Sequence, residues 1–119
     1  MKSFDVRGLA LAQGGEYVLG MKDLHSDACY FIYGVLQATE TDRPIKAGKG
    51  YEEILCAVGG PLLLRTNRGD VTLAQGHAVH VTEDDSFTIA NPSDLPVVYV
   101  LAGGRSRPSD QLPECANSE

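Results

Sequence analysis

Residues 47–91 read AGKGYEEILCAVGGPLLLRTNRGDVTLAQGHAVHVTEDDSFTIAN, and this stretch decides the predicted fold. Short apolar and β-branched runs alternate in it with turns that contain glycine, asparagine or aspartate. Gly59-Gly60-Pro61 closes the first run, and Asn67–Asp70 is typical of a hairpin turn. The pattern predicts a series of short strands joined by tight turns.

Similar runs lie on both sides of this stretch. Leu9–Ala12 is predicted to be an edge strand or a loose arm, and Lys22–Asp27 and Thr39–Lys46 are predicted to be loops. No segment shows sustained helical periodicity, so the sequence predicts an all-β sandwich or barrel over residues 1–102 and a polar tail over residues 103–119. The predicted strands are Glu16–Met21, Ala28–Ala38, Tyr51–Val58, Leu62–Thr66, Val71–Leu73, Ala78–Thr82, Ser86–Ala90 and Val97–Ala102.

Length and charge narrow the class of protein. A chain of 119 residues suits one domain. The formal net charge of −6, with scattered lysines and arginines, disfavours nucleic acid as a partner. No apolar run approaches the ~20 residues of a membrane helix, and the first fifteen residues lack the apolar segment of a signal peptide. The three widely spaced cysteines match no zinc or disulfide pattern, and we expect a cytoplasmic protein without a membrane partner.

The spacing of several residues resembles the two motifs of the cupin family, which are small jelly-roll barrels (double-stranded β-helices). Glu53 and Gly60 reproduce the glutamate-to-glycine spacing of the first motif, and Gly76 and Asn91 reproduce the length of the second. The resemblance covers about half of the chain. It implies a cupin-like barrel with a cavity between its walls.

The same alignment implies that the usual metal site of the family is lost. Three histidines and one glutamate hold the metal in that site, and here Ala47, Lys49 and Phe87 occupy the histidine positions. None of these side chains offers a lone pair to a metal, so no metal cofactor is expected. A rebuilt site around Glu53 is the alternative, and its candidate ligands are His25, His77 and His80.

The resemblance and the two-residue period of a strand together predict which side chains face the cavity. The expected inward set on the first core strand is Ala47, Lys49, Tyr51, Glu53, Leu55 and Ala57. Phe87, Ile89 and Asn91 are expected to share a face of the second motif. The predicted ligand-binding residues are Lys49, Tyr51, Glu53, Phe87, Ile89 and Asn91.

Such a mostly apolar set with a few polar groups favours a metal-independent module that binds a small molecule, such as a sugar derivative or an organic acid held by Lys49. The alternative is a metal-free isomerase or epimerase that resembles the sugar-nucleotide branch of the family. Glu53 or His80 would then be the catalytic base, and Tyr51 or Tyr99 the acid. A residual metal enzyme and a protein without any ligand remain open.

The predicted strand Ala28–Ala38 is apolar on both faces. One face would pack in the core and the other would be free to contact a second subunit, and small barrels cover their exposed strand edges. We therefore expect a homodimer.

Overall fold

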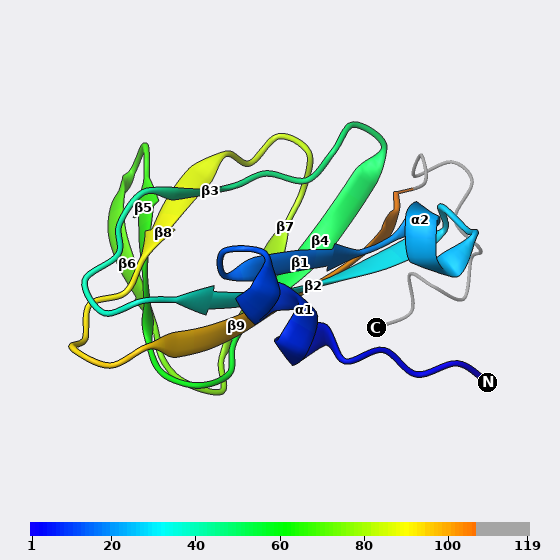
Figure 1. The fold of residues 1–119 in the computed structure, drawn as a ribbon. Coiled ribbons are helices and arrows are strands. Elements are labelled where there is room, and N and C mark those ends of the chain that lie inside the picture. Colours follow the sequence, from blue (N-terminus) through cyan, green and yellow to red (C-terminus); the bar gives the residue numbers. More distant parts are fainter. Residues whose placement is uncertain (107–119) are drawn as a thin grey trace.

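The structure is a computed structural model that describes residues 1–106; residues 107–119 of the predicted tail lie outside the described part. Within it, two antiparallel sheets face each other as a jelly-roll sandwich (Figure 1). The larger sheet has the order β1-β2-β9-β4-β7 and the smaller one the order β3-β8-β5-β6. The predicted all-β fold is confirmed. The strands are β1 Glu16–Leu19, β2 Cys29–Leu36, β3 Arg43–Ile45, β4 Tyr51–Ala57, β5 Leu62–Thr66, β6 Gly69–Leu73, β7 Ala78–Val81, β8 Phe87–Ala90 and β9 Val97–Arg105.

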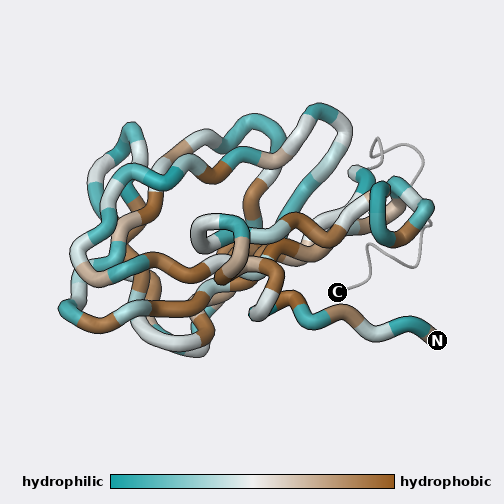
Figure 2. The backbone as a smooth tube through the Cα atoms, viewed as in Figure 1, coloured by the Kyte–Doolittle hydropathy of each residue, from teal (hydrophilic) through white to brown (hydrophobic). Residues whose placement is uncertain are grey.

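The core lies between the two sheets, where Figure 2 shows hydrophobic segments on the facing strands. Side chains alternate across β4: Glu53, Leu55 and Ala57 are buried, whereas Ile54 between them is exposed. This alternation follows from the two-residue period of a strand. It turns one carboxylate, Glu53, into an otherwise apolar interior.

Two short helices precede the core, α1 Val6–Ala12 and α2 Met21–Leu24. The predicted edge strand or arm at Leu9–Ala12 is therefore wrong. Asp5 caps α1 by accepting a hydrogen bond from the backbone nitrogen of Gly8 at 3.0 Å, and leucine and alanine then favour the helix. The helix packs against β1 and β2 (Figure 1), and neither short helix could span a bilayer.

Three other segments differ from the prediction. The first half of the predicted loop Lys22–Asp27 belongs to helix α2. The predicted loop Thr39–Lys46 contains β3, which pairs with β8 at the edge of the smaller sheet. Pro44 is tolerated there because an edge strand has a free side without ladder hydrogen bonds. β9 continues beyond Ala102 to Arg105, so the sheet includes Gly103 and Gly104, which the sequence placed in the tail.

Candidate functional site

The candidate site is built on one row of three paired residues in the larger sheet. Tyr30 on β2 pairs with Gly103 on β9, and Gly103 pairs with Glu53 on β4. A Cβ atom on Gly103 would overlap the Tyr30 ring, so the ring lies over the glycine. This position lets the Tyr30 hydroxyl cross one strand and donate a 2.5 Å hydrogen bond to Oε2 of Glu53.

Glu53 is the buried carboxylate of this row, with 4% of its surface exposed. Within residues 1–106, its second oxygen, Oε1, is the buried side-chain polar atom that has no hydrogen-bond partner. Burial, and then the hydrogen bond to the Glu53 carboxylate, raise the pKa of Tyr30 well above its ordinary value. Tyr30 therefore stays protonated at neutral pH and acts as the donor.

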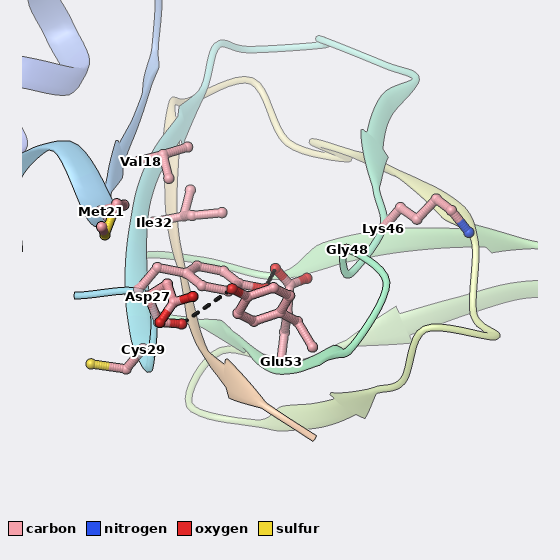
Figure 3. A pocket seen from close by; sticks show the side chains of 11 residues that line it. Val18, Met21, Asp27, Cys29, Ile32, Lys46, Gly48 and Glu53 are labelled. Atoms are coloured by element: carbon pink, nitrogen blue, oxygen red, sulfur yellow. Dashed lines mark hydrogen bonds between the residues drawn. The ribbon is translucent and has the colours of Figure 1, made fainter. Parts of the chain in front are cut away.

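A cavity of about 350 Å³ lies in front of this pair (Figure 3). The side chains of Val18 and Ile32 point toward the same space, and Met21 of α2 stands at its edge. The lining is mostly apolar, with few polar groups. Its residues are Val18, Gly20, Met21, Asp27, Cys29, Tyr30, Ile32, Lys46, Gly48, Tyr51 and Glu53.

Tyr51 lies at the rim of the cavity, where contacts with neighbouring residues fix its position. Its hydroxyl donates to the backbone carbonyl of Asp27 at 3.2 Å, and its ring meets the Tyr30 ring edge-on, with centroids 5.7 Å apart. The guanidinium of Arg105 lies 5.5 Å from the centre of the Tyr51 ring and forms an ion pair with the Asp27 carboxylate. These contacts tie the last residues of β9 to the loop before β2.

Two predicted site residues, Glu53 and Tyr51, line this cavity together. Lys49 does not line it: the residue is exposed in the turn before β4, so the predicted inward position of Lys49 is wrong. The lysine at the cavity is Lys46. Figure 3 shows its side chain directed away from Glu53, and its Nζ donates to the backbone carbonyl of Glu83 at 3.5 Å.

The three predicted residues of the second motif lie elsewhere. Ile89 is fully buried in the core, and Phe87 lines a separate groove with Leu64 and Val79. Asn91 is buried, and its Nδ2 donates to the carbonyls of Leu36, Gln37 and Leu95, while its Oδ1 accepts from Ser93. The amide of Asn91 therefore organises a loop. Phe87 packs against the core cluster that contains Ile89, so these two residues share the inward face of β8, but neither lines the Glu53 cavity.

The histidines do not gather around Glu53. His80 pairs in register with the exposed Ile54, and its ring contacts Glu52 at 2.7 Å with 57% of the side chain exposed. His80 therefore lies on the face of the sheet opposite to Glu53, so the geometry does not support His80 as the catalytic base of the enzyme alternative. His25 and His77 are exposed, and no group of three or more potential metal ligands occurs within residues 1–106.

Tyr30 and Gly103 are site residues that the sequence reasoning missed. The alternation of β2 placed Tyr30 on one face with Ile32 and Leu36, which was the available signal. If the last strand is extended through Gly103, this glycine marks a position without a side chain, and the Tyr30 ring lies there. The pair of glycines after Ala102 was instead interpreted as the start of the tail.

A second row of the same sheet repeats the arrangement. Tyr99 lies over Gly34, and its hydroxyl donates to a carboxylate oxygen of Glu16 on β1. Nη1 of Arg43 donates to the Tyr99 hydroxyl at 3.1 Å, and Nη2 donates to Glu40 at 2.6 Å. Within residues 1–106, no buried side-chain polar atom of this row lacks a partner, whereas the row with Glu53 leaves one oxygen free and lines a cavity.

Solved structures with the same architecture decide the fold. A cupin protein from Bacteroides fragilis superposes with a TM-score of 0.65 over 85% of this chain and 82% of that protein, at 17% sequence identity. The chain has the cupin fold.

Other cupins with the same fold carry different descriptions. A sugar phosphate isomerase from a cupin superfamily of Silicibacter pomeroyi has a TM-score of 0.60 at 18% identity, covering 82% of this chain and 64% of that one. A predicted oxalate decarboxylase from Thermotoga maritima has a TM-score of 0.62 at 19% identity, covering 79% and 86%. No protein-family model and no curated protein sequence matches the chain. These likenesses show the fold alone.

Proposed function

We propose that this cupin domain binds a small organic molecule in the cavity lined by Tyr30, Tyr51 and Glu53. Its volume of about 350 Å³ lies at the lower end of ligand pockets. Its mostly apolar wall with a few converging polar groups is typical of such pockets. The proposed ligand is therefore small, with an apolar part and a polar end.

The observation that carries the proposal is the free oxygen Oε1 of Glu53. Buried polar atoms in native proteins are almost always hydrogen-bonded, and leaving one unpaired costs about 1–3 kcal/mol. Glu53 is 4% exposed, and Oε1 lacks a partner. A ligand that donates a hydrogen bond to this oxygen would recover that free energy, which gives the cavity a specific polar anchor.

The structure also changes which ligands fit. An organic acid was expected to pair with Lys49, but that residue is exposed outside the cavity. The carboxylate of Glu53 would repel a negative ligand, and the ammonium group of Lys46 is directed away (Figure 3). A ligand with hydrogen-bond donors is favoured over an organic acid.

A fragment screen tests the proposal. Small alcohols, amines, polyols and acids would be added to ¹⁵N-labelled protein, and the amide shifts would be followed by NMR. We expect the largest shifts around residues 30, 53 and 103. Shifts confined to the groove at Phe87, or none with any fragment at millimolar concentration, would overturn the proposal.

A second candidate function is metal-free proton transfer, and the 2.5 Å contact between Tyr30 and Glu53 favours it. Glu53 would remove a proton next to a carbonyl through its free Oε1, and Tyr30 would supply the acid in place of Tyr51 or Tyr99. A carboxylate positioned against substrate is a suitable general base.

Deuterium incorporation tests this activity. Small uncharged aldehydes and ketones would be incubated with the protein in deuterated water, and exchange at the carbon next to the carbonyl would be followed by NMR. Catalysed exchange that disappears in Glu53→Gln and persists in Glu52→Gln supports the enzyme. Equal exchange by wild type and Glu53→Gln would contradict it.

We also propose that the domain forms a homodimer through the outer face of the larger sheet. Phe31, Ala102 and Ile54 form one paired row of this face, and Ile54 is about half exposed. This apolar row, which ends at His80 beside Ile54, can pair with its own copy about a two-fold axis. Light scattering should give a dimer mass for wild type and a monomer mass for Ile54→Glu; a wild-type monomer would refute the proposal.

A further inference from the structure

We infer that the ligand of the Glu53 cavity is a small organic cation, such as a primary amine with a short apolar body. This inference rests on the proposed function and adds the chemical class of the ligand. It follows from the balance of charge in the cavity, from the unpaired oxygen of the Glu53 carboxylate and from the tyrosine rings beside it.

The charge that faces the cavity without a partner is negative. Asp27 at the rim is neutralised by its ion pair with Arg105. Lys46 lines the cavity, but its side chain is directed away from Glu53 and its Nζ contacts the carbonyl of Glu83 (Figure 3). Cys29 also lines the cavity, and Figure 3 shows its sulfur pointing away from Glu53. Glu53 is left as the unneutralised charge at the inner end.

A positively charged group on the ligand would complement the Glu53 carboxylate. Burying a carboxylate is costly unless it is both hydrogen-bonded and paired with a positive charge. The Tyr30 hydroxyl supplies a hydrogen bond to Oε2 but no charge. An ammonium group carries three donors and one positive charge, so it would satisfy Oε1 and neutralise the carboxylate together.

The aromatic wall is suited to the same head group. Cations bind to the faces of tyrosine rings, and the attraction grows where water is excluded. The Tyr51 ring already has the Arg105 guanidinium 5.5 Å from its centre, so one face of this ring holds a cation in this structure. The Tyr30 ring stands beside it at an interplanar angle of 65° and contacts the carboxylate. One carboxylate and two tyrosine rings therefore line the cavity, with Tyr51 at its rim.

The apolar wall disfavours a heavily hydroxylated ligand. Val18, Ile32 and Met21 offer no hydrogen bond to the several hydroxyl groups of a sugar. Each hydroxyl buried against them would lose its contact with water. The same wall suits the short hydrocarbon body of an amine. The charge of Glu53 and the apolar wall of the cavity therefore both favour an amphipathic cation as the ligand.

Three fragments of equal length test the class of ligand: n-butylammonium, 1-butanol and n-butyrate. Binding to the ¹⁵N-labelled full chain would be measured by amide shifts at neutral pH and low salt. We expect butylammonium to bind at least about tenfold more tightly than butanol, with shifts around residues 30, 53 and 103. Butyrate should not bind.

Two matched variants locate the effect. Glu53→Gln keeps the shape of the side chain and removes its charge, so the affinity for butylammonium should fall to that for butanol. Glu52→Gln removes the same charge from the adjacent residue, whose side chain contacts His80 on the other face of the sheet. It should leave the preference for the cation unchanged.

The outcomes separate the two proposals. If butanol or butyrate binds the cavity as well as butylammonium, the cationic class is wrong and the binding function stands. If none of the three shifts the cavity residues at millimolar concentration, and the broader screen also finds no ligand there, the binding function itself is wrong. The fragment series uses the wild-type protein, so the test does not depend on Glu53→Gln folding.

Discussion

The Tyr30 ring lies over Gly103 on the neighbouring strand, and this contact places the Tyr30 hydroxyl against Glu53. A tyrosine on one strand can reach a carboxylate two strands away only if the position between them has no side chain. Tyr99 uses Gly34 in the same way to reach Glu16. The larger sheet therefore contains two tyrosine–carboxylate pairs, each made possible by a glycine.

Gly103→Ala should break the pair at the candidate site. The new methyl group overlaps the Tyr30 ring, so the ring must move and the buried Glu53 carboxylate loses its donor. We expect the free energy of unfolding to fall by about 1–3 kcal/mol, as measured by urea denaturation. Gly104→Ala is the control, because its nearest new contact is the Ala28 carbonyl at 3.3 Å. Equal effects of the two changes would contradict this account.

Tyr99→Phe should destabilise the second row. It removes a hydroxyl that accepts from Arg43 and donates to Glu16, and Tyr99 itself is fully buried. We expect a loss of about 1–3 kcal/mol in the same denaturation experiment. Tyr33→Phe removes a hydroxyl on the other face of the sheet and should cost less than about 0.5 kcal/mol. An unchanged free energy of unfolding in Tyr99→Phe would refute the role of this row in stability.

Alkaline pH should destabilise the protein through both tyrosines. Burial raises the pKa of Tyr30 and of Tyr99 above the ordinary tyrosine value, with smaller contributions from their carboxylate partners. The unfolded chain loses these protons near pH 10 while the folded protein keeps them, so the stabilisation is complete below about pH 10 and is lost above it. Denaturation from about pH 8 to about pH 11 should show this fall.

The matching variant makes the alkaline effect specific. Tyr30→Phe removes one of the two titrating groups, so its stability should fall less steeply above about pH 10 than that of wild type. Absorbance of ionised tyrosine at alkaline pH should show the delayed titration directly. An identical pH profile in wild type and variant would mean that Tyr30 does not contribute.

Asn91→Ala should cost stability without changing ligand binding. The Asn91 amide donates hydrogen bonds to the carbonyls of Leu36, Gln37 and Leu95, and those carbonyls would lose this donor. We expect a loss of about 2–3 kcal/mol, against less than about 0.5 kcal/mol for Asn67→Ala in the exposed hairpin turn. Weaker fragment binding at the Glu53 cavity in the folded variant would restore Asn91 as a site residue.

His80→Ala should change little. The contact between His80 and Glu52 is exposed, and exposed pairs contribute about 0–1 kcal/mol. Stability and fragment binding at the Glu53 cavity should both stay close to wild type. A large loss of binding in this variant would mean that the histidine acts at the site from the opposite face of the sheet.

The strands were predictable from the sequence because their signals are local. β5 was predicted with its observed bounds, and β4 and β7 were each predicted within one residue. Alternation along β4, together with the resemblance to the cupin motif, also placed Glu53 on the buried face. The helix α1 was missed because its signal is the cap at Asp5, whereas the interpretation relied on apolar periodicity over too short a segment.

The sequence by itself determined most of the β-strands, their turns and which side chains share a face of β4 with Glu53, because these depend on neighbours in the chain. Only the tertiary structure decided what stands beside that carboxylate. The pairing of β9 with both β2 and β4 brings Tyr30, Gly103 and Glu53 into one row, although they are far apart in the sequence. The pairing of β7 with β4 places His80 opposite the exposed Ile54, and Lys49 lies in the exposed turn before β4. Sheet order and register are set by packing of the whole chain, and they decide which side chains meet.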